Sequence, residues 1–107
     1  MRQQIEIHPI SAEFFEQINR LPNWEATEFG EKCAVESHEH EHDAMYFTKG
    51  VKNLRFGEKR LELPNLAAVF IPRGHEHGWS GVKEGSEKAV VGHFHTGHGI
   101  HKIVPEY

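Results

Sequence analysis

Three pairs of histidines in this 107-residue chain share one spacing, with a single residue between the two members. The pairs are His38 and His40, extended by His42, then His75 and His77, and finally His93 and His95. Because side chains two residues apart on a β-strand point to the same side, each pair is expected on one face of a sheet. Neutral imidazole is the commonest protein ligand for transition metals. The spacing therefore predicts a metal site inside a β protein.

A carboxylate follows the first pair closely enough to complete a common type of metal site. Non-haem iron sites use two histidines and one carboxylate, and they leave other coordination positions open. The segment SHEHEHD supplies His38, His40 and Asp43, and the segment IPRGHEH supplies His77 after a turn. These four residues are the candidate ligands.

The first part of the chain, residues 1–23, predicts a short strand and the one expected helix. Ile5 and Ile7 alternate with polar neighbours, as in a strand. In the segment SAEFFEQINRLP, Ser11 can cap the start of a helix and Pro22 stops it. The apolar residues of this segment recur at helical spacing; they are Phe14, Phe15, Ile18 and Leu21.

From Trp24 onward the pattern is one of short strands separated by turns. The candidate strands are EKCAVESHEHEH, AMYFT, NLRF, KRLEL, LAAVFI, HEHGWS, KAVVGHFHT and IHKIV. Gly57 and Glu58 predict a hairpin turn between NLRF and KRLEL. The run LAAVFI predicts a strand buried on both faces, and Met45 and Phe47 are expected to face the interior. Strands of this kind predict a sandwich or a barrel.

Two segments carry a resemblance to a known family. Residues 72–77 read PRGHEH, residues 46–50 read YFTKG, and 21 residues separate Gly50 from Pro72. In these features the chain resembles the cupins, which are small jelly-roll barrels whose second motif contains Pro-x-Gly-x2-His. The resemblance covers roughly residues 30–95. It implies an all-β, double-stranded β-helix (a jelly-roll barrel) with one short N-terminal helix.

The first motif departs from the family pattern and leaves the ligand register open. Two residues, rather than the family's three or four, separate His40 from Asp43. One explanation is a strand that lacks a bulge at this point. The other is that His40 and His42 are the ligands, with Tyr46 in the place of the carboxylate.

The resemblance also implies roles for particular residues. His38, His40, Asp43 and His77 would bind one divalent transition metal, with His42 in reserve. The family binds iron, manganese, nickel, zinc or copper in such a site, and imidazole-rich sites accept all of these. Three further residues are candidates for contacting a substrate or supporting the ligands: Arg73, Trp79 and His93.

Three functions are compatible with such a site. The first is a metal-dependent enzyme of the dioxygenase or isomerase type, acting on a small organic acid or a sugar-like molecule, with the metal as Lewis acid. The second is a stand-alone sensor or binding module for a small ligand, similar to the sugar-sensing domains of arabinose-regulator-type transcription factors. The third is a purely structural metal, held by four protein ligands with no open position.

Composition and charge indicate which partners and which cellular compartment to expect. The formal net charge is −4 without a basic stripe, so nucleic acid is not an expected partner. No apolar run has the length of a membrane span, and the single cysteine, Cys33, fits a reducing cytoplasmic compartment. The length fits one cupin-like domain over residues 1–107, with residues 1–23 preceding a barrel of residues 24–104. A hydrophobic content of 37% indicates a modest core, so a homodimer is expected.

Overall fold

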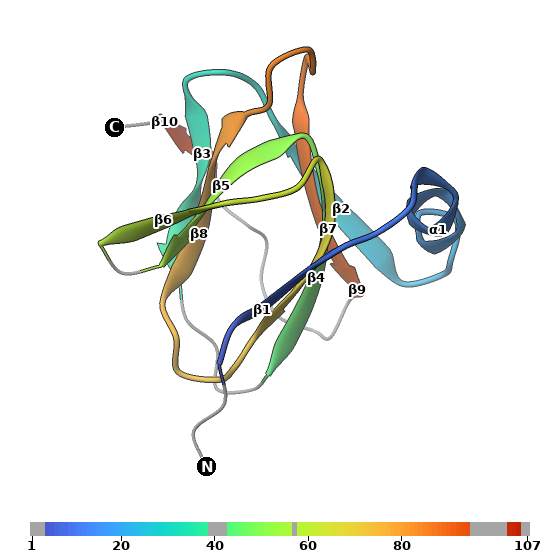
Figure 1. The fold of residues 1–107 in the computed structure, drawn as a ribbon, viewed down its shortest axis with the longest axis horizontal. Coiled ribbons are helices and arrows are strands. Elements are labelled where there is room, and N and C mark those ends of the chain that lie inside the picture. Colours follow the sequence, from blue (N-terminus) through green and yellow to red (C-terminus); the bar gives the residue numbers. More distant parts are fainter. Residues whose placement is uncertain (1–3, 39–42, 57, 95–102, 106–107) are drawn as a thin grey trace.

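Strands make up most of the chain that the computed structural model describes, namely residues 4–38, 43–56, 58–94 and 103–105. Within these residues there are ten strands and one helix (Figure 1). In chain order they are β1 (Glu6–Pro9), α1 (Ala12–Ile18), β2 (Trp24–Phe29), β3 (Cys33–His38), β4 (Ala44–Lys49), β5 (Val51–Phe56), β6 (Lys59–Glu62), β7 (Leu66–Ile71), β8 (His77–Val82), β9 (Ala89–Phe94) and β10 (Ile103–Pro105). The expected β structure with one short N-terminal helix is confirmed.

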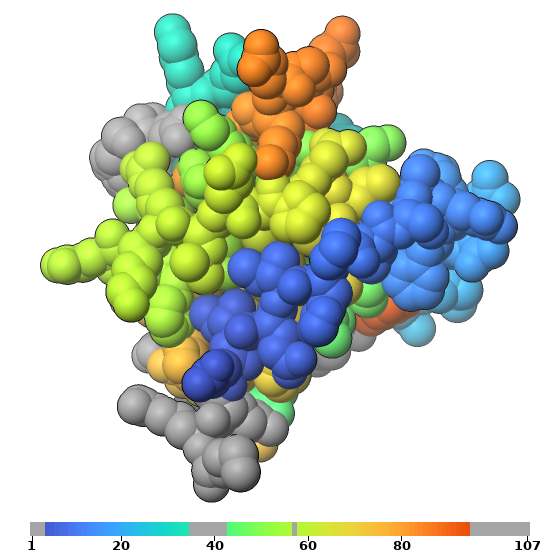
Figure 2. Space-filling model, viewed as in Figure 1, coloured from blue at the N-terminus to red at the C-terminus, as the bar shows by residue number. Residues whose placement is uncertain are grey.

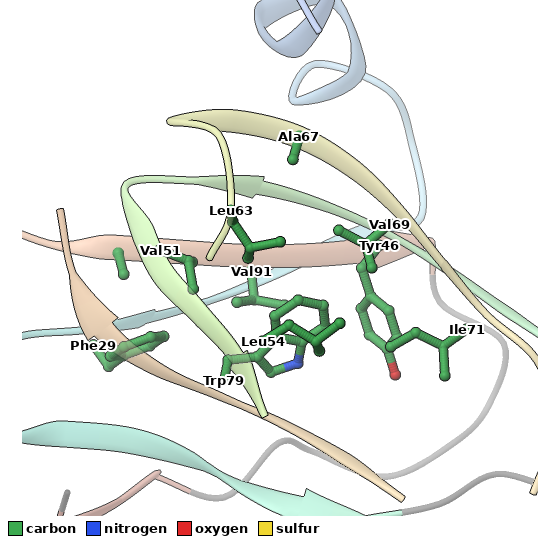
Figure 3. Packing of buried hydrophobic residues seen from close by; sticks show 11 residues of the cluster. Phe29, Tyr46, Val51, Leu54, Leu63, Ala67, Val69, Ile71, Trp79 and Val91 are labelled. Atoms are coloured by element: carbon green, nitrogen blue, oxygen red, sulfur yellow. The ribbon is translucent and has the colours of Figure 1, made fainter. Parts of the chain in front are cut away.

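The strands form two five-stranded antiparallel sheets. The first sheet has the order β1-β7-β4-β9-β2 and the second the order β10-β3-β8-β5-β6. Buried side chains from both sheets pack into one hydrophobic core, shown in Figure 3. Trp79, Tyr46 and Leu54 are the largest fully buried side chains in it. The core therefore joins β4 of the first sheet to β5 and β8 of the second.

The hairpin predicted around residues 57 and 58 is present. β5 and β6 pair with Leu54 opposite Leu61 and Arg55 opposite Arg60. Gly57 itself lies outside the described residues. The alternation of Leu and charged residues along both strands gives this pair one apolar face, and Leu54 is fully buried in the core.

Two predictions about burial in the first sheet are wrong. In β7 every second residue is buried, but the intervening Leu66, Ala68 and Phe70 are only half-buried, so the strand is not covered on both faces. In β4 the side chain of Met45 is 45% exposed and that of Phe47 is only half-buried, whereas Tyr46 lies in the core. The cause is the same in both strands. Apolar residues occupy the outward as well as the inward positions, so hydrophobicity alone cannot show which face packs on the core.

Helix α1 has seven residues, which is about two turns. It ends at Ile18, and the amide of Leu21 donates to the carbonyl of Ile18 in a turn beyond the helix. Phe15 and Ile18 are buried, but Phe14 and Leu21 are exposed. The buried face is therefore narrower than expected, because the chain leaves the helix before Leu21 can join it. In the described part of the chain, no helix is long and apolar enough to cross a membrane.

The start of α1 gives a first testable prediction. The hydroxyl of Ser11 accepts a hydrogen bond from the amide of Phe14 at 3.1 Å, which satisfies one of the free donors of the first turn. Ser11→Ala should lower the free energy of unfolding by about 1 kcal/mol in urea denaturation. Ser11→Asp keeps an acceptor there and should lose much less. Equal losses of unfolding free energy in Ser11→Ala and Ser11→Asp would show that the acceptor side chain at position 11 does not stabilise the helix.

Candidate metal centre

The best-defined ligand candidate is His77, the first residue of β8. Its side chain is buried, with 1% exposure. The ring Nδ1 lies 2.9 Å from the carbonyl oxygen of His75, at the end of the turn that contains Gly74. A carbonyl oxygen can only accept a hydrogen bond, so Nδ1 carries the proton of the neutral ring. The lone pair is therefore on Nε2, the arrangement commonly found in metal-binding histidines.

A buried tyrosine faces that lone pair. The hydroxyl of Tyr46, from β4 of the other sheet, lies 3.1 Å from His77 Nε2. Burial raises the pKa of Tyr46 above its ordinary value, so the hydroxyl keeps its proton and donates to Nε2. This hydrogen bond joins the two sheets inside the core. Sequence reasoning considered Tyr46 only as a substitute ligand and missed its contact with His77, which lies 31 residues further along the chain.

Aromatic rings surround this hydrogen bond. The ring centroid of Tyr46 lies 5.1 Å from that of Trp79 and 5.7 Å from that of His93. The centroids of His77 and Trp79 are 6.2 Å apart. The structure thus brings together Trp79 and His93, two of the residues proposed from sequence to support the site, around Tyr46 and His77. In Figure 3 the indole nitrogen of Trp79 and the hydroxyl of Tyr46 lie toward the same end of the core.

Trp79 also has an unsatisfied donor. Its side chain is fully buried, yet Nε1 has no hydrogen-bond partner among the described residues. Buried indole N–H groups are normally paired, because leaving such a donor without a partner costs about 1–3 kcal/mol. An unpaired donor next to Tyr46 and His77 requires an acceptor atom from beyond the described residues.

The backbone register brings the first histidine segment beside His77. β3 pairs with β8, and the Cα atom of His38, the last residue of β3, is the partner of the Cα atom of His77. Along β3, between Val35 and His38, the pairing with β8 is irregular, and this irregularity shifts the register. His40 and His42 follow immediately in the sequence but lie outside the described residues. The choice between the two ligand registers therefore stays open.

Asp43 and Arg73 meet at one end of the same region. Asp43 Oδ1 accepts a hydrogen bond from the backbone amide of Arg73 at 3.0 Å, and the Nε atom of Arg73 lies 3.6 Å from the same oxygen. The carboxylate thus ties the residue before β4 to the turn that leads to His77. The Arg73 side chain is 72% exposed, so this ion pair is well solvated and contributes little by itself. The role of Asp43 as a metal ligand stays a prediction.

The second member of the middle pair, His75, has a different environment. Its half-buried ring stacks on Phe56 of β5, with centroids 5.2 Å apart and an interplanar angle of 25°. Its carbonyl, rather than its ring, contacts His77. His75 and His77 are thus close in sequence but distinct in chemistry, which makes them a matched pair for mutagenesis.

Burial of Tyr46 gives a second prediction, about alkaline pH. A folded-state pKa above the unfolded value means that the stabilisation from the buried phenol is complete below about pH 10 and is lost as the pH rises beyond it. In an absorbance titration of tyrosinate, Tyr46 should ionise only as the protein unfolds. Tyr46→Phe should remove this late component and reduce the alkaline loss of stability. A Tyr46→Phe titration identical to that of the wild type would contradict the assignment.

Among the described side chains, no three His, Cys, Asp or Glu residues form a group that could hold a metal ion. His77 has the tautomer and the burial of a ligand, and the backbone of His38 is its neighbour. Further ligands must come from other side chains, and two of the predicted ones, His40 and His42, lie outside the described residues. No model of a known protein family, no curated protein and no solved structure matches the chain.

Proposed function

We propose that this chain is a small cupin-like protein whose two sheets form a jelly-roll barrel around one divalent transition-metal ion. The observation that carries the proposal is His77, a buried imidazole whose Nδ1–H is fixed by a carbonyl and whose Nε2 lone pair faces the interior. His38, His40 and Asp43 are the proposed further ligands, with His42 in reserve. Iron, manganese, nickel, zinc and copper all suit such a donor set.

Tyr46 has a defined part in this proposal. Nε2 of His77 has one lone pair, so it cannot both accept the Tyr46 hydrogen bond and bind a metal. Metal binding therefore requires the Tyr46 hydroxyl to leave Nε2. The freed hydroxyl is then available to contact a bound molecule. Tyr46 thus couples occupation of the metal site to binding of a ligand.

The donors at the site indicate the chemical class of that ligand. Tyr46 supplies one hydroxyl, and the buried indole N–H of Trp79 supplies a donor without a partner among the described residues. Both groups suit a small molecule with acceptor oxygens, such as an organic acid or a sugar-like compound. The bound metal would act as a Lewis acid toward such an oxygen. We propose a metal-dependent enzyme of dioxygenase or isomerase type in a cytoplasmic setting.

The alternative is a ligand sensor without catalysis. Apolar side chains fill the core around Trp79, among them Leu54, Ile71 and Val91. Such side chains supply no acid or base for a reaction. A sensor would need no open coordination position on a metal.

An exogenous ligand distinguishes these functions. The protein should be loaded with Co²⁺ and its visible absorption recorded before and after addition of azide. An enzyme with an open coordination position should change its spectrum on azide binding, and His77→Ala should abolish the cobalt spectrum. A cobalt spectrum that azide leaves unchanged would indicate a closed structural site. Failure to bind cobalt would overturn the metal proposal and favour the sensor.

A further inference from the structure

An acidic residue on an edge strand of the first sheet lies on the inward side. β2 forms this edge beside β9, and its last residue, Phe29, is buried in the core. Because side chains alternate along a strand, Glu25 lies on the same side of β2 as Phe29, while Trp24 and Glu28 lie on the outer side. The ring of Trp24 packs there on Phe94 of β9, with centroids 5.6 Å apart. Glu25 thus places a carboxylate on the inner side of the sheet.

Glu25 begins a row of polar side chains that crosses the sheet toward the candidate metal centre. Its Cα atom is the partner of that of His93 in the pairing of β2 with β9. The ring of His93 in turn contacts that of Tyr46, with centroids 5.7 Å apart. Exposure decreases along the row: Glu25 is exposed, His93 is half-buried and Tyr46 is 2% exposed. These three residues, which we call the polar row, lead from solvent to the hydroxyl that contacts His77.

Beyond Tyr46 the same row becomes apolar and ends at the other edge of the sheet. Val69 of β7 is the Cα partner of Tyr46, and Ile7 of β1 is the partner of Val69. Val69 is fully buried, and Ile7 packs against the core. Figure 2 shows the atoms of β1, in blue, lying across this face of the molecule. The polar end of the row that solvent reaches is therefore the Glu25 end.

The polar row and Trp79 offer complementary hydrogen-bonding groups. A carboxylate such as that of Glu25 has about four lone-pair sites, so it can accept a hydrogen bond from a ligand in addition to its other contacts. Nδ1 of His93 lies 3.2 Å from the carbonyl oxygen of Phe94 and so carries the proton, which makes Nε2 the acceptor atom. Trp79 can only donate, and its buried N–H has no partner among the described residues. A ligand hydroxyl both donates and accepts, so it suits both sides, whereas an ionised carboxylate can only accept.

The charges around the row also favour a neutral ligand. An organic acid would bring its negative charge close to Glu25, in a chain whose formal net charge is already −4. Arg73, the candidate partner for a substrate carboxylate, already has its Nε atom 3.6 Å from a carboxylate oxygen of Asp43. Repulsion between two unit charges about 6 Å apart in partly solvated surroundings corresponds to roughly a tenfold loss of affinity.

We propose that Glu25 and His93 form the hydrogen-bond-accepting side of the ligand site and select a neutral polyhydroxy compound, such as a sugar, over an organic acid. This inference rests on the proposed small-molecule site at Tyr46 and Trp79, and it narrows the two ligand classes given there to one. Glu25 was not among the residues predicted from the sequence. A single glutamate on a strand is ordinary, and only the pairing with β9 places it beside His93.

Nuclear magnetic resonance of the two indole N–H groups tests this inference in zinc-loaded protein. The chain has two tryptophans, and Trp24 Nε1 already donates to Asn19 at 2.6 Å, so its signal is an internal reference. Trp79→Phe identifies the other signal. The probes are galactose and glucose, each compared with its uronic acid, galacturonate or glucuronate, at constant ionic strength. Each sugar should shift the Trp79 signal with a dissociation constant at least about tenfold below that of its acid, while the Trp24 signal stays in place.

Glu25→Gln is the decisive variant, because it keeps the shape of an exposed side chain and removes its charge. Its dissociation constants for each sugar and the matching acid should differ by less than about threefold. Glu28→Gln is the matched control, since Glu28 lies on the outer side of the same strand, 3.9 Å from Lys88, and should leave both constants unchanged. Melting curves should show both variants to be folded.

Three results would overturn the inference: neither sugar shifts the Trp79 signal, the acids bind as tightly as the sugars, or Glu25→Gln discriminates like the wild type. The zinc content of the same samples separates this inference from the metal proposal. Protein that binds no zinc but still prefers the sugars would contradict the metal centre and support the polar row. Protein that holds zinc but shows no preference for the sugars would support the metal centre and contradict the polar row.

Discussion

His77→Ala should reduce the metal content of the purified protein from about one ion per chain to less than about one tenth of that value. The variant removes the only candidate ligand whose burial, proton position and lone pair are all defined in the structure. Loss of one ligand of a small set weakens binding by orders of magnitude, because the remaining donors no longer complete the coordination shell. Elemental analysis of untagged protein measures the effect.

The matched control is His75→Ala. It removes an imidazole two residues away whose ring stacks on Phe56, while the backbone carbonyl that accepts from His77 stays in place. Metal content should therefore change little, and the same is expected for His98→Ala. Equal metal loss in His75→Ala and His77→Ala would mean that the histidine cluster binds ions without a defined site.

Gly92→Ala should lower the free energy of unfolding by about 1–3 kcal/mol, the usual effect of overpacking. Gly92 lies on β9 directly beneath the indole ring of Trp24, and a methyl group there would overlap three atoms of that ring. Displacing the ring would break its 2.6 Å hydrogen bond to Asn19 and its edge contact with Phe15. Helix α1 and strand β2 would both lose the contacts that Trp24 makes between them. Chemical denaturation measures the change.

Gly30→Ala is the corresponding control. A Cβ atom at Gly30 would meet nothing within 4 Å, and its backbone requires no positive φ, so its effect should stay within about 0.5 kcal/mol. A double-mutant cycle tests the cause directly. In a Trp24→Ala background, Gly92→Ala should lose most of its effect, because the ring it displaces is gone. An unchanged effect in that background would assign the destabilisation to the backbone of β9.

The type of most elements could be predicted from the sequence, although β2 was not among the expected strands, but the direction in which their residues face could not. Alternation of polar and apolar residues gives a strand its face, and β7 lacks alternation because Leu66, Ala68 and Phe70 are apolar on the outward side. In β4 the same ambiguity makes Met45 look like a core residue, although the core residue at this point is Tyr46. The missing information was which of the two apolar faces of each strand packs on the core.

The candidate site could be predicted in part for a similar reason. The turn before His77 depends on residues that are adjacent in the sequence, so the segment PRGHEH is enough to predict His77 as a candidate ligand. The contact between Tyr46 and His77 joins two sheets, and the pairing of His38 with His77 depends on a register irregularity in β3. Neither feature leaves a local signal in the sequence. The hydrogen bond between Asp43 and the Arg73 amide is a further example, because it joins residues that lie 30 positions apart.

The most direct test of a metal centre is elemental analysis of the native, untagged protein combined with its melting curve with and without a chelator. The proposal predicts about one transition-metal ion per chain and a melting temperature that falls by at least about 5 °C when the metal is removed. Protein that carries no transition metal, and whose melting temperature is the same with and without chelator, would contradict it.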